Sequence, residues 1–281
     1  MAAAFGVWEV KFPSSRAVYD EEDEEDEELS TSENELKISE FHWISRNINQ
    51  KPSPTHCSLL VLAIGEVGTT FVEAHYLSAG SEIVACISTN KRNEIDFENL
   101  CSPSKSDETS RLYRLKTPHD NDSAVLCQCP TPVSQEKAFQ WTEKLFEFLK
   151  PSKVVILSSA PACEYHTDTP ENLKSDFVKV LKTDSWLEKL SQKECSLLET
   201  PNVISGVAAS VLQYCQIHNL AAALFVCFME SSHVDSQSVE TFKFLLRSPP
   251  LNSLHQASAE QVTKVLKSLR SGKLIEMNMY M

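Results

Sequence analysis

The residues best suited to covalent chemistry lie in the segment C-E-Y-H-T-D, which runs from Cys163 to Asp168. A thiol, an imidazole and a carboxylate can act as nucleophile, general base and orienting group. Activation of the thiol requires the base within hydrogen-bonding distance, and closeness along a loop does not supply that geometry. We therefore interpret Cys163 and His166 as ordinary loop residues and predict no catalytic residue in this segment.

A second candidate is the turn G-E-V-G, from Gly65 to Gly68, which follows an apolar run of strand length. Open α/β sheets bind ligands at the carboxyl ends of their strands, so a small-molecule-binding or hydrolase-like enzyme would use the crevice after Gly65. A dinucleotide-binding turn needs a third glycine, which is missing here. We favour a tight connection between a strand and a helix, and keep the enzyme as the alternative.

The cysteines and histidines offer no clear metal site. Nine cysteines are spread over the chain without a C-x-x-C pair, and the eight histidines show no ligand spacing. Cys127 and Cys129 fall on one side of a predicted strand, but no further ligands accompany them. The pattern predicts reduced and mostly buried thiols that pack in a core, with no metal and no cofactor.

The end of the chain is a third candidate, and it suggests binding rather than catalysis. Met279, Tyr280 and Met281 place an aromatic ring and its hydroxyl beside the terminal carboxylate. Chain ends are usually mobile, so these groups could enter a pocket on another protein, where a lysine would pair with the carboxylate. The alternative is an edge strand packed on the protein's own domain.

These candidates depend on a sheet and on helices that can be predicted from the pattern of apolar residues. Apolar runs of strand length occur at 58–64, 82–88, 153–159 and 220–228, and the segments 111–116 and 123–129 predict two further strands, arranged as a hairpin. Helical spacing is found at 67–77, from Ser134 to a stop at Pro151, and at 207–215. Fully apolar strands alternating with amphipathic helices indicate a three-layer α/β/α sandwich with a mostly buried, mixed sheet.

The chain divides into three parts. Residues 20–28 are nine consecutive carboxylates, so we predict a mostly disordered acidic arm over 1–55, in which a short amphipathic piece could form around Leu36 to Ile48. A single α/β domain is expected over 56–273. Its last helix begins at a capping box, Ser258 to Gln261, and ends at Gly272. Residues 274–281 would then form an extended C-terminal tail.

Charge and hydropathy exclude two classes of partner. The net charge is −13, but without the nine carboxylates of the arm 30 acidic groups face 26 basic ones. A nearly neutral domain lacks the basic surface that nucleic acids require. The longest apolar run has ten residues, Leu220 to Met229, which is half of what a membrane helix needs. With no secretory signal apparent, we expect a cytoplasmic protein.

Several separated blocks resemble the proteasome assembly chaperone family, and they occur in the family's order. They are L-C-Q-C at 126–129, Q-W-T-E-K-L-F at 140–146, L-L-E-T-P-N-V-I-S-G-V-A-A-S-V-L-Q-Y-C-Q at 197–216 and V-E-T-F-K-F-L-L at 239–246. The resemblance covers the chain from about Ser58 to its end, and the acidic arm is in keeping with it. It implies a fold related to phosphorylase and hydrolase-like α/β/α domains, without their chemistry.

The resemblance also implies a function and partners. The family ends in a hydrophobic residue, tyrosine and any residue (HbYX), which matches Met279, Tyr280 and Met281. In proteasome activators this pattern docks between alpha subunits of the core particle. The expected partners are proteasome assembly chaperone 2, as a heterodimer, and the alpha ring, whose unproductive pairing the heterodimer prevents. Cytoplasmic location with an association with the endoplasmic reticulum is implied in the same way.

Overall fold

The core of the protein is a nine-stranded mixed sheet. The computed structural model describes residues 41–45, 54–77, 81–88, 109–115, 117, 123–130, 133–167, 175–188, 195–231 and 233–278, with side chains up to 269. The order of the strands across the sheet is β1-β3-β4-β5-β2-β6-β9-β7-β8. The strands are β1 His42–Ser45, β2 Thr55–Ile64, β3 Ile83–Ser88, β4 Ser110–Leu115, β5 Ala124–Cys129, β6 Leu149–Pro161, β7 Phe177–Lys182, β8 Ser196–Leu197 and β9 Ala221–Met229.

The four central strands β5, β2, β6 and β9 are parallel, and antiparallel strands flank them on both sides. The central strands are almost continuously buried because helices cover both faces. β4 and β5 pair antiparallel, with Leu115 opposite Ala124, which confirms the predicted hairpin.

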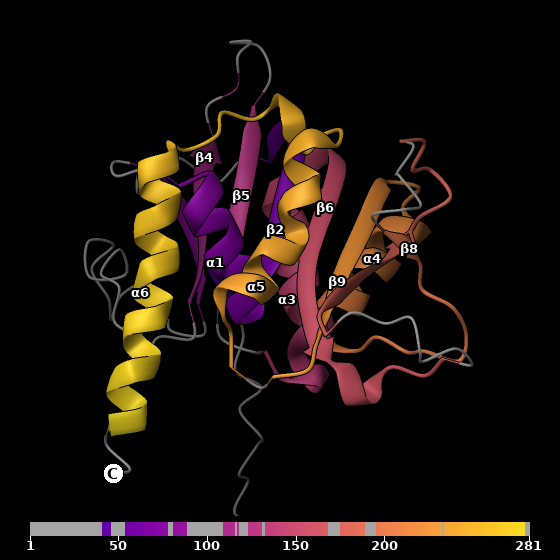
Figure 1. Cartoon of the computed structure of the whole chain (residues 1–281). Helices are drawn as coiled ribbons and strands as arrows, with labels where there is room; N and C mark the ends of the chain where they lie inside the picture. Colours follow the sequence, from indigo (N-terminus) through magenta and orange to yellow (C-terminus); the bar gives the residue numbers. More distant parts are fainter. Residues whose placement is uncertain are drawn as a thin grey trace, which may run out of the picture. The chain divides into compact units, whose positions relative to one another are not determined.

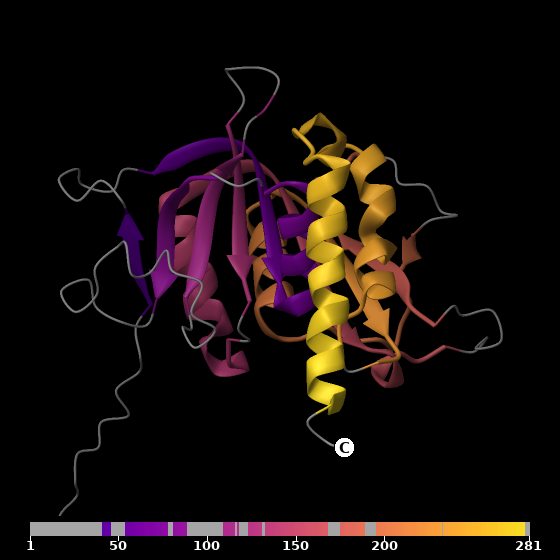
Figure 2. The same cartoon turned by 60° about the vertical axis from the view of Figure 1, so that its left-hand side comes forward.

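The helices form a layer on each face of the sheet, as Figures 1 and 2 show. Behind the sheet in Figure 1 lie α3, Gln135–Phe148, and α4, Gly206–Ile217. In front of it lie α1, Gly65–His75, α5, Ser236–Glu240, and α6, Ala259–Asn278. Short 3-10 helices cover 162–164, 241–247 and 251–253. The predicted α/β/α sandwich is therefore confirmed.

Each face of the sheet has its own hydrophobic core. Trp141 and Leu145 of α3 pack with Val211 of α4 on one face, and Phe71 of α1 packs with Phe242 on the other. Seven of the eight described cysteines are buried, which confirms that the thiols pack in the core. Burial raises the pKa of Cys129 to about 11, so its thiol stays protonated and is a poor metal ligand at neutral pH.

The predicted acidic arm over 1–55 is wrong at its C-terminal end. His42–Ser45 form strand β1, which pairs antiparallel with β3, and Thr55 already begins β2. Phe41 and Ile44 are almost fully buried, and Trp43 stacks on Phe148 of α3 with ring centroids 4.9 Å apart. These apolar contacts hold the segment on the sheet although it follows the acidic run. The run itself, at 20–28, lies outside the described residues.

Two other predictions of local structure need correction. Helix α3 ends at Phe148 rather than at Pro151, because β6 begins at Leu149 and Pro151 already pairs with Cys57 of β2. Strand β7, which pairs antiparallel with β9, was not predicted. Its alternation of buried Val178 and Val180 with Lys179 is typical of a strand with one exposed face.

Candidate functional site

The position of the C-terminal residues depends on how α6 is attached to the rest of the domain. The start of α6 is tied to the end of α1 by two hydrogen bonds. The Ala257 amide donates to the carbonyl of His75 over 2.7 Å, and the Gln261 side chain donates to the carbonyl of Leu77. In the predicted capping box only one half forms. The Gln261 amide donates to Ser258 Oγ at 3.4 Å, but its side chain bonds the Leu77 carbonyl, just after α1, instead of the Ser258 amide.

Beyond its first turns α6 is attached more loosely. The apolar residues at helical spacing are only half-buried, and two of them, Leu266 and Leu269, contact the core; the others are Val262 and Val265. In Figures 1 and 2 the last turns of α6 extend beyond α1 and α5. The helix is therefore anchored at one end and carries its other end away from the sheet.

Two predictions about this helix are wrong. It does not end at Gly272, and the chain from residue 274 to Asn278 is helical rather than extended. Helix α6 continues through Gly272 to Asn278. The residues after the glycine include Leu274, Glu276 and Met277, which are good helix formers, whereas a single glycine costs only about 1 kcal/mol within a helix. Met279, Tyr280 and Met281 lie outside the described residues, so the binding site predicted there remains a prediction.

His75, whose carbonyl accepts the hydrogen bond from Ala257, is expected to make the stability of the domain depend on pH. Its imidazole is buried against Phe71, with ring centroids 4.8 Å apart, and its Nε2 atom has no hydrogen-bond partner among the residues that the structure describes. Burial lowers the pKa of His75 below its ordinary value of 6.5, the charge of Lys243 lowers it further, and Glu240 opposes both. A protonated imidazole is therefore less stable in the folded protein than in the unfolded chain.

We expect the unfolding free energy to fall as the pH drops below about 6.5, because the unfolded chain then binds a proton that folded His75 resists. The contribution of neutral His75 to the unfolding free energy is fully present above this pH. In His75→Phe the ring stays apolar, and the loss of stability between pH 7.5 and 5.5 should be smaller than in the wild type. Urea denaturation at both pH values measures this, and equal losses in the two proteins would contradict the assignment.

The turn at Gly65 is explained by packing. Gly65 has a φ of +73°, a conformation that favours glycine, and it begins α1 directly after β2. At Gly68 an added Cβ would lie 3.0 Å from the carbonyl oxygen of Leu157 in β6, so this glycine lets α1 pack closely on the sheet. Glu66 places a negative charge in the first turn of α1, which disfavours an anionic ligand there. These contacts support the strand-to-helix connection over the enzyme.

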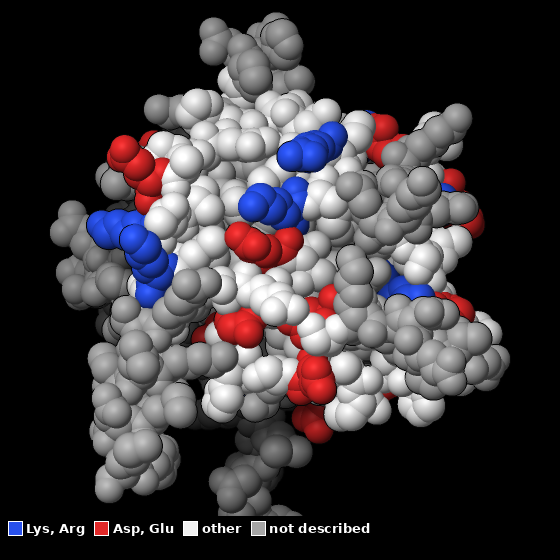
Figure 3. All heavy atoms as spheres, viewed as in Figure 1, with Lys and Arg blue, Asp and Glu red and all other residues white. Residues whose placement is uncertain are grey.

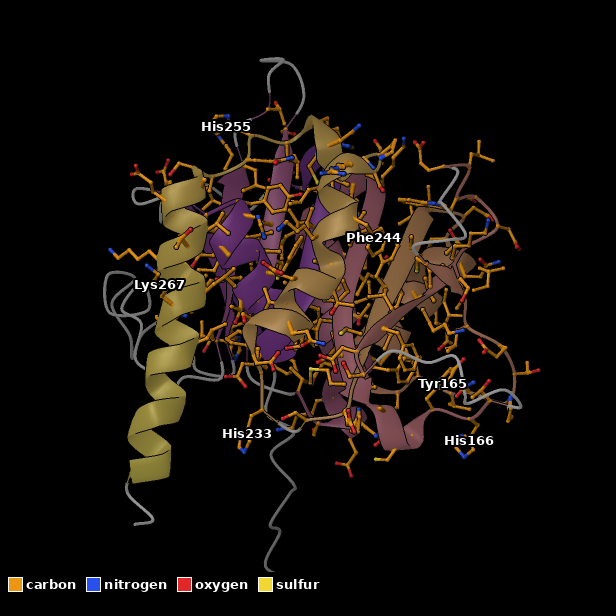
Figure 4. The ribbon with its side chains drawn as sticks, in the orientation of Figure 1. Tyr165, His166, His233, Phe244, His255 and Lys267 are labelled. Atoms are coloured by element: carbon orange, nitrogen blue, oxygen red, sulfur yellow. The ribbon has the colours of Figure 1, made fainter. Side chains whose placement is uncertain are left out.

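Cys163 and His166 are not arranged as a nucleophile and its base. Cys163 is exposed in the 3-10 helix Ala162–Glu164. The His166 Nδ1 atom lies 3.0 Å from the Glu164 carbonyl, and the backbone of His166 is held by Asn202. Among the described residues no hydrogen bond joins the two side chains, and Asp168 lies outside them. Figure 4 shows His166 at the outer margin of this region, below Tyr165.

The role that the sequence resemblance implies, assembly of alpha rings, provides a test of these two residues. We expect Cys163→Ser and His166→Ala each to leave this role unchanged in cells depleted of the native protein, because among the described residues neither side chain has a partner for catalysis. The amount of assembled core particle is the measurement. Loss of assembly in a variant that is folded and still binds the partner that the resemblance implies would restore the enzyme alternative.

A polar cluster that the sequence analysis missed surrounds Tyr165. The tyrosine hydroxyl donates to Glu199, and Lys179 Nζ lies 3.0 Å from Glu199 Oε2 and 3.0 Å from Ser196 Oγ. Lys179 also lies over the ring of Tyr165, 5.2 Å from its centroid. Burial opposes the charge on Glu199, but the hydrogen bonds from Tyr165 and Lys179 outweigh it and lower the pKa of this carboxyl.

This cluster joins separate segments at the sheet edge, namely the segment after β6, strand β7, and β8 with the loop that follows it. The ring of Tyr165 packs against Phe177 and Phe228. Every charged or hydroxyl group in the cluster thus has a partner within the protein, so the arrangement serves to fix the loops. No local motif could have predicted it, because Tyr165 and Glu199 are 34 positions apart.

The comparisons with known proteins give the family. The family model PAC1, described as "Proteasome assembly chaperone 4", matches residues 1–281. Proteasome assembly chaperone 1 of Nematostella vectensis is 41% identical over 246 residues, which cover 86% of this chain and 93% of that protein. The Homo sapiens protein of the same name is 29% identical over 297 residues, which cover both chains completely.

Two solved structures share the fold at low sequence identity. The Pyrococcus furiosus protein PbaB, "an archaeal proteasome activator", has a TM-score of 0.56 at 12% identity and covers 87% of this chain and 100% of its own. PbaA from the same organism, "an archaeal homolog of proteasome-assembly chaperone", has a TM-score of 0.52 at 10% identity, with coverage of 86% and 92%. The fold is thus that of PbaA-type α/β domains. The chain belongs to the proteasome assembly chaperone family, and the relatives that it matches over most of their length are named proteasome assembly chaperone 1.

Proposed function

We propose that this protein promotes assembly of the alpha ring of the core proteasome as a heterodimer with proteasome assembly chaperone 2. In this role it also prevents alpha rings from pairing with one another before assembly is complete. Membership of the proteasome assembly chaperone family is the observation that carries this proposal. The names of the relatives are in keeping with a non-enzymatic role. The close packing of Gly68 is too, as is the absence of a hydrogen bond between the Cys163 and His166 side chains among the described residues.

The docking element in this proposal is the terminal sequence Met279, Tyr280 and Met281. The ring of the tyrosine adds buried area and a hydroxyl that a pocket can satisfy, and the terminal carboxylate can pair with a lysine of that pocket. Helix α6 supports such a role because it is anchored on α1 at its start and extends past the other helices at its end. A helix of 20 residues spans about 30 Å, enough to present a terminal peptide well away from the sheet.

Other classes of partner fit the surface less well. On the face shown in Figure 3 the lysines and arginines are scattered among carboxylates and uncharged residues, without the continuous basic area that a nucleic acid would need. No helix within the described ranges is long and apolar enough to cross a membrane. We propose action in the cytoplasm, with the association with the endoplasmic reticulum that the family resemblance implies.

A pull-down with full-length protein and with a chain ending at Asn278 tests the proposal. Alpha subunits and a second chaperone of similar size should accompany the wild type. The shortened chain should keep the second chaperone and lose most of the alpha subunits. A small-molecule ligand in place of these proteins would favour the enzyme that uses the crevice after Gly65.

A further inference from the structure

Helix α4 has an unusual surface, because it contains no charged residue anywhere between Gly206 and Ile217. One side of the helix packs into the core through Val207, Val211 and Cys215. The other side carries Ser210, Gln213 and Ile217 in one row at helical spacing, and the last two are exposed. A helix on the surface of a soluble domain normally has charged residues on its outer side, and α4 has none.

Exposed apolar side chains gather around this row. Phe139 of α3 is 57% exposed, Val203 just before α4 is 85% exposed and Ile217 is 65% exposed. They are three of the five large exposed apolar side chains in the part of the chain that the structure describes. We call the surface made by Phe139, Val203, Ser210, Gln213 and Ile217 the α3–α4 face.

Contacts between the two helices bring Phe139 of α3 next to the first residues of this row on α4. The Gln135 side chain donates to Ser205 Oγ over 3.2 Å, and Thr142 Oγ1 donates to Ser210 Oγ over 3.0 Å. Phe139 lies between Gln135 and Thr142, so it stands beside the first turns of α4.

The α3–α4 face is also held rigidly. Tyr214 stacks on Phe146 of α3 with ring centroids 4.4 Å apart and planes 7° apart, and on its other side it contacts His218 at 4.1 Å. Thr142 and Ser210 are small residues that allow the two helices to approach closely. The two helices are thus fixed against each other, so their backbone need not rearrange when a partner covers this surface, which favours tight binding.

The chemistry of the face indicates a permanent partner. Interfaces of obligate complexes are apolar and poor in charge at their centre, whereas surfaces that bind and release a client resemble the rest of the protein surface. Exposed Phe139, Val203 and Ile217 beside a helix without charge fit the first kind.

The rim of the face argues against pairing with a second copy of the same chain. Glu136, Glu143 and Glu147 are exposed on the same side of α3 as Phe139, at spacings of three, four and eight residues from it. Glu147 is paired with Lys144 at 2.8 Å. A second copy could bring like carboxylates together at this rim, whereas a different chain with basic residues around an apolar centre would complement it.

We propose that the α3–α4 face is the surface that binds the second chaperone of the heterodimer, and that this partner presents an apolar centre with a basic rim. The inference rests on the proposed heterodimer and gives it a location. It leaves α6, which lies on the opposite layer, free to contact the alpha ring.

Binding between full-length chains tests the inference. The protein and its variants are co-expressed with proteasome assembly chaperone 2, purified, and the dissociation constant of the heterodimer is measured by sedimentation. Phe139→Glu and Ile217→Glu each place a carboxylate on the apolar centre and should weaken the heterodimer at least about thirtyfold. Glu143→Lys should weaken the heterodimer less, mainly by slowing its association. The difference in affinity between this variant and the wild type should become smaller at high salt.

Thr263→Glu is the matched control, since it adds the same charge at an exposed position of α6 on the other layer and should leave the affinity unchanged. Unchanged melting temperatures show that the variants are folded. If the wild-type heterodimer forms and the Phe139→Glu and Ile217→Glu variants bind as tightly as the wild type, only the proposed location is overturned. Absence of a wild-type heterodimer would overturn the proposed partner as well, and self-association through this face would overturn the choice of a different chain.

Discussion

Replacing Tyr280 with alanine should lower the affinity for the alpha ring by about thirtyfold or more. The substitution removes the aromatic ring and its hydroxyl from a terminal anchor, and an anchor of this size contributes roughly 2 kcal/mol or more to binding. The described core and the α3–α4 face lie upstream of residue 280, so folding and heterodimer formation should not change. Alpha-ring binding is measured at equal heterodimer content.

A chain extended by a few residues after Met281 is the companion variant. It keeps the tyrosine but moves the carboxylate away from the position where a lysine could pair with it, so binding should weaken to a similar extent. If both the extended chain and Tyr280→Ala bind the alpha ring as tightly as the wild type, the terminal residues are not a docking element.

Deleting residues 1–50 should destabilise the domain by about 3–6 kcal/mol, because Phe41 and Ile44 are almost fully buried and each contributes about 1.5–3 kcal/mol. The deletion also removes β1 and its pairing with β3, and the stacking of Trp43 on Phe148. Stability is measured by urea denaturation of the shortened and full-length chains.

Deletion of residues 1–38 is the matched control for this experiment. It removes the nine carboxylates of the acidic run and leaves Phe41 and β1 in place. Because like charges at this density repel one another, their loss should change the stability little. Equal stability of the 1–50 deletion and the full-length protein would show that β1 does not contribute to the fold.

The sequence predicted those parts of the fold that have a strong local pattern. Strands such as β2 and β9 are apolar over most of their length, which is possible only for strands covered on both faces. Strand β1 was missed because its four residues contain a single aliphatic side chain, Ile44, and follow a polar segment. Its place in the sheet depends on Phe148 and β3, which are distant in sequence.

Dependence on residues distant in sequence also limited the prediction of the candidate sites. The motif at Gly65 could be interpreted from its own residues, because a single turn sets the conformation. The Tyr165 cluster and the α3–α4 face could not, because they bring together residues that are far apart along the chain. The end of α6 was predicted wrongly since Gly272 is a common cap, yet the helix formers after it outweigh a penalty of about 1 kcal/mol.

We propose that this protein assists assembly of the alpha ring. The most direct measurement reconstitutes alpha subunits with and without the full-length protein and its partner chaperone, and determines the yields of single and paired alpha rings. We expect the heterodimer to raise the yield of single rings and lower that of paired rings, with Tyr280→Ala reducing both effects. Equal yields with and without the heterodimer would contradict the proposed function.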